Sequence, residues 1–139
     1  MKRVALALLA AFAGPFVAFA APNEPADALR VELNAAESVQ SRCQLSFVIE
    51  NKGGAAVDSL KLDFAVFGTS GVVQRRLVAE LGPLRPAKTV VKAFEIEGEC
   101  ASIGSLLVND VTVCTPGEAG ACLDRMVLTS KLTNVRLFK

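Results

Sequence analysis

Apolar and polar residues alternate along most of the chain beyond residue 28. Such alternation is typical of β-strands that have one face buried and the other face in water. Clusters of Gly, Pro and Asn separate the alternating segments, as turns do. Seven strands are therefore expected, at residues 29–35, 43–50, 60–66, 73–81, 90–96, 106–113 and about 126–137.

This spacing of strands predicts an all-β fold. Two half-buried sheets packed face to face would form a single immunoglobulin-like β-sandwich of about seven strands, and a small barrel is the alternative. Residues 68–71 have the composition and length of a short hairpin loop. Four phenylalanines are expected in the core: Phe47, Phe64, Phe67 and Phe94.

The first twenty residues have the pattern of a signal peptide. Two basic residues follow the initial Met, an Ala- and Leu-rich run continues to Phe19, and small residues precede the expected cut after Ala20. A retained membrane anchor is the alternative, but the run is shorter than the roughly 20 apolar residues that span a bilayer. The expected division is residues 1–20 for the signal peptide, 21–28 for a flexible N-terminus and 29–139 for the sandwich domain.

Charge and hydropathy then limit the partners. The chain has 15 Lys and Arg and 14 Asp and Glu, and the signal peptide holds two of the basic residues and none of the acids. The mature net charge of −1 gives no electrostatic attraction to nucleic acid. No second apolar run is long enough to span a membrane. We expect a periplasmic or secreted protein.

Four cysteines lie beyond the signal peptide, at Cys43, Cys100, Cys114 and Cys122. An even number of cysteines in an exported chain is typical of disulfides, and four cysteines allow three pairings. We favour Cys43–Cys100 and Cys114–Cys122, because the second pair brackets a Gly- and Pro-containing loop and would staple the base of a terminal hairpin. Chain entropy predicts stabilisation of about 4 and about 2.5 kcal/mol. Redox or metal chemistry is the alternative, but the chain has no C-x-x-C motif and no His.

A segment in the middle of the chain resembles a known module. A strand that ends at Asn51 and a Gly turn is followed by apolar Val57 and then by alternating apolar residues up to Phe67. The segment from Phe64 to Gly68 is similar to the Phe-x-Leu-Tyr-Asp stretch of FxLYD-type immunoglobulin-like domains of bacterial cell envelopes, although Gly68 replaces the Asp. Residues 108–122 are similar to alphaproteobacterial secreted proteins of unknown function. These resemblances imply a compartment and a fold, and no activity.

The composition excludes several kinds of chemistry. The absence of His removes the usual Ser-His and Cys-His nucleophiles and His-ligated metals. The absence of Trp and Tyr removes most stacking surfaces for sugars and single-stranded nucleic acid. We therefore expect a protein that is not an enzyme and that has no cofactor, no catalytic residues and no metal ligands.

Three charged clusters offer alternatives to this expectation. Alternating Glu95, Glu97 and Glu99 would line one face of a strand, either as a weak cation site or as an ordinary solvated face. A second group near the 115–121 loop, formed by Asn109, Asp110 and Asp124, is either a similar cation site or a set of turn-forming residues. A basic strip for an acidic partner would form if adjacent strands carry Arg75, Arg76, Lys88 and Lys92, and the alternative is an ordinary solvated face.

The leading functional prediction is a non-enzymatic module that binds or assembles with another envelope protein, through the 115–121 loop or an exposed edge strand. One alternative is a purely structural component that oligomerises through its sheet edges. The other is a cation-dependent, carboxylate-based enzyme that uses the Glu95 strip.

Overall fold

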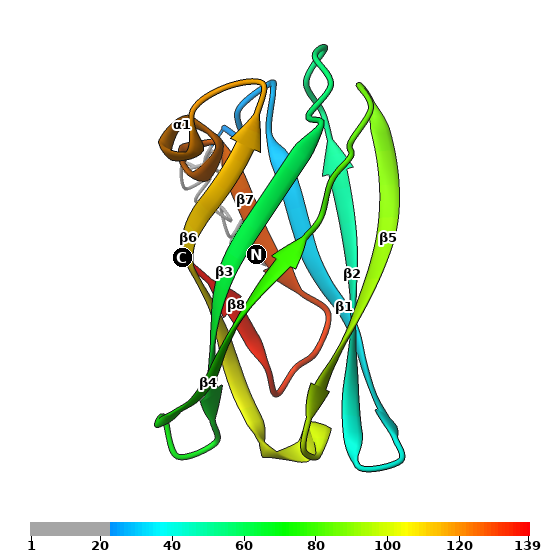
Figure 1. Cartoon of the computed structure of the whole chain (residues 1–139), viewed down its shortest axis with the longest axis vertical. Helices are drawn as coiled ribbons and strands as arrows, with labels where there is room; N and C mark the ends of the chain where they lie inside the picture. The colour runs from blue at the N-terminus through cyan, green and yellow to red at the C-terminus, as the bar shows by residue number, and fades with distance from the viewer. Residues whose placement is uncertain (1–22) are drawn as a thin grey trace, which may run out of the picture.

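The computed structural model describes residues 23–139, which form two four-stranded sheets packed face to face (Figure 1). The strands are β1 (Leu29–Val39), β2 (Arg42–Asn51), β3 (Ser59–Gly68), β4 (Val73–Glu80), β5 (Lys88–Glu97), β6 (Ile103–Thr115), β7 (Met126–Ser130) and β8 (Arg136–Phe138). One sheet has the order β5-β2-β1-β7 and the other β4-β3-β6-β8. The prediction of an all-β sandwich is confirmed, and the predicted signal peptide lies outside the described residues.

The chain crosses between the sheets several times. The hairpins β1–β2 and β3–β4 each stay within one sheet, and β5 returns from β4 to pair with β2 along its whole length. The next strand, β6, lies beside β3 in the second sheet. Such Greek-key connections are characteristic of immunoglobulin-like sandwiches.

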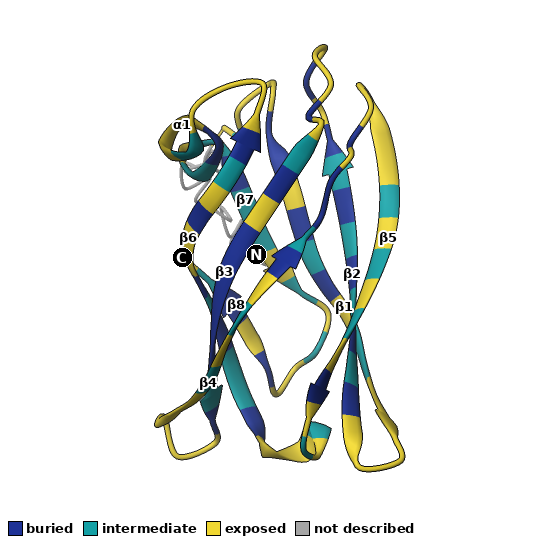
Figure 2. Ribbon diagram, in the orientation of Figure 1, coloured by how far each residue is buried: buried dark blue, intermediate teal, exposed yellow. Residues whose placement is uncertain are grey.

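The core follows the alternation of the sequence. Along β2 the odd-numbered residues from Cys43 to Asn51 are buried and the even-numbered residues are more exposed (Figure 2). Phe47 on β2 meets Phe64 on the opposite sheet with ring centroids 5.5 Å apart, and Phe94 on β5 lies 6.1 Å from Phe47. Three of the four predicted core phenylalanines therefore pack in or against the core.

The prediction that Phe67 lies in the core is wrong. Val66 fills the inward position on β3, and Phe67 is partly exposed on the other face of the sheet. Its ring lies 6.3 Å from that of Phe138 on β8, and the Arg136 guanidinium lies 4.2 Å from the centroid of Phe138. The parity of the strand decides the position of Phe67 despite its hydrophobicity, and the C-terminal strand partly covers it.

The end of the chain also differs from the prediction of a single last strand. Residues 126–137 divide into β7, which pairs in parallel with β1, and β8, which pairs in parallel with β6 in the other sheet. The Ser130 hydroxyl accepts a hydrogen bond from the Leu132 amide and donates one to the Val135 carbonyl, at 3.2 and 2.6 Å. This local turn makes eight described strands where about seven were expected.

The first disulfide joins Cys43 to Cys100, as the sequence analysis favoured. Cys43 is fully buried on β2, and Cys100 begins the short 3-10 helix η1 (Cys100–Ser102), where the chain passes from β5 to β6. The bond therefore ties one sheet to the crossover into the other. No helix within residues 23–139 has the length and hydropathy of a membrane span.

Candidate functional site

The second disulfide, Cys114–Cys122, fixes a short helix at one end of the sandwich. Cys114 is at the end of β6, and Cys122 lies in α1 (Ala119–Asp124). The pairing is as favoured, but the predicted hairpin is wrong: β6 and β7 belong to different sheets, so the bond joins a strand to a helix. Because a six-residue helix is marginal in isolation, the disulfide and the surrounding contacts hold it.

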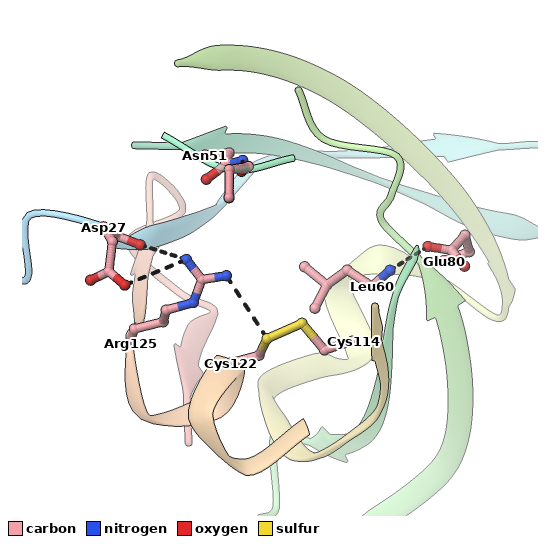
Figure 3. Close-up of a disulfide and its surroundings, with 8 residues drawn as sticks. Asp27, Asn51, Leu60, Glu80, Cys114, Cys122 and Arg125 are labelled. Carbon is pink, nitrogen blue, oxygen red and sulfur yellow. Dashed lines mark hydrogen bonds and ion pairs between the residues drawn. A yellow bond between two sulfur atoms is a disulfide. The ribbon is translucent and has the colours of Figure 1, made fainter. Parts of the chain in front are cut away.

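Arg125 connects this helix to the start of the domain. Its Nη1 donates a hydrogen bond of 2.8 Å to the Asp27 carbonyl and lies 3.8 Å from the Asp27 carboxylate (Figure 3). Its Nη2 lies 3.9 Å from the Cys122 sulfur. Asp27, in the segment before β1, thus makes specific contacts with this end of the sandwich.

Lys139 contacts the same carboxyl end of the helix as Arg125 does. The Lys139 ammonium donates hydrogen bonds to the carbonyls of Leu123 and Asp124, at 2.5 and 3.3 Å. A cation next to the carboxyl end of a helix compensates for unpaired carbonyls and for the helix dipole. We call residues 115–125, held by the disulfide, Arg125 and Lys139, the stapled end.

Most of the stapled end faces solvent. Its exposed residues are Thr115, Pro116, Gly117, Glu118, Gly120, Ala121 and Asp124. The Asp58 amide donates a hydrogen bond of 2.6 Å to the Thr115 carbonyl, which holds the first of these residues against the neighbouring β2–β3 connection. The structure therefore presents a small exposed surface whose backbone is fixed at both ends.

A buried asparagine supports the loops beside the stapled end. Asn51 is 0% exposed, and its amide nitrogen donates to the Ala55 carbonyl at 2.8 Å and to the Leu84 and Arg85 carbonyls at 3.4 Å each. Its side-chain oxygen accepts a hydrogen bond from the Gly53 amide. One amide thus connects the turn after β2 with the connection between β4 and β5, two segments far apart in sequence.

Glu80 has a similar role at the end of β4. One carboxylate oxygen accepts a hydrogen bond of 2.8 Å from the Leu60 amide (Figure 3). The same oxygen accepts one of 2.8 Å from the Gly82 amide, and the other oxygen accepts one of 2.6 Å from the Ser59 hydroxyl. Burial raises the pKa of Glu80, but these three hydrogen bonds outweigh it, so the pKa lies below the ordinary value of 4.5. A Cβ at Gly82 would lie 2.9 Å from the same carboxylate, which explains why Gly occupies that position.

The lowered pKa of Glu80 predicts a pH-dependent contribution to stability. At neutral pH the ionised carboxylate stabilises the fold, and this contribution falls as the pH drops below 4.5 and through the folded pKa. Glu80→Gln keeps partners for the three hydrogen bonds but loses the charge, so we expect a loss of about 1 kcal/mol near pH 7. Urea unfolding should show the wild-type and variant free energies converging as the pH falls below 4.5 and through the folded pKa, whereas a constant difference would contradict this role.

A shallow hollow of about 270 Å³ lies on the outer face of the β5-β2-β1-β7 sheet, and sequence reasoning did not identify it. Arg30 lies in its lining, where it forms ion pairs with Glu24 at 2.5 Å and Glu50 at 3.3 Å. The hydrogen bond from Arg30 holds the pKa of Glu24 below its usual value. Because these charges satisfy one another, the hollow offers no unpaired arginine to a ligand.

The predicted acidic clusters do not combine into a metal site. Glu95 forms an ion pair with Arg42 at 3.2 Å, while Glu97 and Glu99 are exposed. The other two acids, Asp110 and Asp124, lie on β6 and α1. Across residues 23–139, no three His, Cys, Asp or Glu side chains are arranged to hold a cation.

The predicted basic strip is divided between two sheets. Arg75 and Arg76 lie on β4, and Lys88 and Lys92 lie on β5, which is an edge strand of the other sheet. Arg76 points to the outer face and is paired with Asp63, whose pKa its hydrogen bond lowers. The strip therefore does not form on paired strands as the sequence analysis suggested.

Comparisons with known protein families, with curated proteins and with solved structures find no match to this chain. The similarity to FxLYD-type domains therefore stays a prediction. Asn51 and the turn after it, which form part of that resemblance, have a structural role in this fold as the buried connection between two loops.

Proposed function

We propose that this chain is an exported, non-enzymatic protein-interaction module of the bacterial cell envelope and that its stapled end contacts the partner. The observation that carries the proposal is the fixation of an exposed segment by the Cys114–Cys122 bond, Arg125 and Lys139. A surface already held in one conformation loses little further entropy on binding, which favours affinity. The two disulfides support the export part of the proposal, because disulfides form and persist outside the reducing cytosol.

Photo-crosslinking in intact cells tests this proposal. A photoreactive amino acid at exposed Glu118 of the stapled end is expected to capture a discrete envelope protein. The same amino acid at exposed Asp110, on β6 and five residues before the stapled end begins, is the matched control and should not capture it. Equal capture from both positions, or no capture from Glu118, would remove the stapled end from the account.

A second variant tests whether fixation matters. Replacing Cys114 and Cys122 by alanine removes a bond that joins residues eight apart in sequence. The chain-entropy model gives this bond a stabilising contribution of about 2.5 kcal/mol. At a temperature where this variant stays folded, we expect the Glu118 crosslink to weaken at least tenfold. Size-exclusion chromatography separates the structural alternative, because a stable homo-oligomer that captures no other protein would favour an oligomerising envelope component.

A further inference from the structure

The two long sides of the sandwich differ. On one side residues 131–135 carry the chain from β7 directly to β8, so a local turn closes the gap between the sheets. On the other side the edge strands are β4 and β5, joined by the connection at residues 81–87 (Figure 1). The Arg75 guanidinium, on β4, lies close to Gly98, just after β5: it is 3.7 Å from the position that a Cβ would occupy on this glycine. The two edges therefore lie on the same open side.

The backbone of β5 is available along this open side. All ten residues of β5 pair with β2 on one edge, and none of the described strands pairs with the other edge. Within residues 23–139, no turn or loop backbone group bonds to β5 either. A long edge strand with unpaired N–H and C=O groups is a template for one more strand.

Cations without ion-pair partners line this edge. Exposure alternates along β5 so that Lys92 shares the inward side with Val90, Phe94 and Ile96, and Lys88 has the same parity. Lys88, Lys92 and Arg75 form no ion pair with any residue in the range 23–139. The acids of β5, Glu95 and Glu97, have the opposite parity, and Arg42 already engages Glu95.

We propose that the free edge of β5 adds an extended, acidic segment of a partner protein as a fifth strand. This goes beyond the proposed function, which places its contact at the stapled end, and rests on it only for the premise that the partner is a polypeptide. Lys88 and Lys92 lie four residues apart, about 13 Å along a strand. Carboxylates four residues apart on the added strand would face these two lysines, and an apolar residue midway between them would face Val90. The recognised pattern is therefore acidic-x-apolar-x-acidic.

Charge argues against a second copy of this chain as the occupant. Pairing two β5 edges would bring two sets of the same cations together, and juxtaposed like charges oppose association. Inward-pointing charges on edge strands are also a known protection against self-pairing. An acidic partner turns the same lysines into favourable contacts, and Val91, 67% exposed on the outer side of β5, adds an apolar contact.

A labelled peptide with the repeat glutamate–threonine–valine–threonine–glutamate tests this inference by fluorescence anisotropy on the full mature protein. Binding is expected to weaken at least tenfold in Lys88→Glu/Lys92→Glu and to weaken as salt rises. The matched control, Lys61→Glu/Lys131→Glu, makes the same change of charge on other elements and should keep the affinity within about twofold. If the charge reversal disturbs folding, the neutral Lys88→Gln/Lys92→Gln variant takes its place, and it is expected to lose less affinity for the peptide than the charge reversal would.

Strand addition is distinguished from simple charge attraction by the peptide backbone. N-methylation of the amides that face β5 should abolish binding, whereas N-methylation of the alternate amides should not. No binding to the wild-type protein, equal binding to Lys88→Glu/Lys92→Glu and to Lys61→Glu/Lys131→Glu, or insensitivity to N-methylation would each overturn the inference. A dimer of the wild-type protein that dissociates in the Lys88→Glu/Lys92→Glu variant would also overturn the inference, because a second copy of the chain would then occupy the edge. If the Glu118 crosslink persists in any of these cases, the proposed function stands while the acidic-segment inference fails.

Discussion

A variant in which Cys43 and Cys100 are both replaced by alanine is expected to lose about 4 kcal/mol of stability relative to the oxidised wild type. The bond closes a separation of 57 residues, which contains β3, β4 and β5. Its removal therefore frees the unfolded chain more than removal of a local bond would. Because a domain of this size has a total stability of roughly 5–15 kcal/mol, the loss is a large fraction of it. Guanidinium unfolding of the mature domain measures the effect.

The Cys114→Ala/Cys122→Ala variant is the control for this prediction. It removes a closure of eight residues, and the expected loss is about 2.5 kcal/mol. The difference between the two double variants tests the entropic argument, because both replace two cysteines by the same residue. Equal losses, or a larger loss for the stapled end, would contradict it.

Asn51→Asp is expected to destabilise the fold by about 3–5 kcal/mol near pH 7, although the two side chains have nearly the same shape. The amide nitrogen of Asn51 faces three carbonyl oxygens, and a carboxylate would place a buried negative charge against all three. Burial raises the pKa of such a carboxyl group, so the loss should be smaller near pH 4, where the group carries a proton. Urea unfolding at both pH values gives the two free energies.

Asn134→Asp is the matched substitution at an exposed position in the β7–β8 connection. It makes the same chemical change where water solvates the charge, and the expected effect is within about 0.5 kcal/mol. If Asn51→Asp is as mild as this control, the buried amide does not hold the two loops together.

The strands and the Cys114–Cys122 pairing could be predicted because each depends on local information, and with four cysteines this pairing leaves Cys43 to Cys100. Period-two alternation is clear in β2, and the Gly- and Pro-containing segment between Cys114 and Cys122 indicated a short closure. The last strand was predicted as one because residues 126–137 contain neither Gly nor Pro. The break at Ser130 depends on hydrogen bonds from its hydroxyl, which hydropathy does not encode.

The site was harder to predict than the fold. Phe67 was placed in the core on hydrophobicity, although strict alternation with Val66 would have placed it on the outer face. The helix α1 is too short to show a helical period in the sequence. Neither the Arg125–Asp27 contact nor the position of Lys92 on the open edge follows from local sequence, because each depends on which strands become neighbours.

The most direct test of the central claim is the intact mass of the native protein from cells, alkylated without reduction. The central claim is that the two sheets close after export, with all four cysteines oxidised. The account predicts a chain that begins at Ala21 and carries no alkyl groups. A chain that retains residues 1–20, or one that carries four alkyl groups, would contradict it.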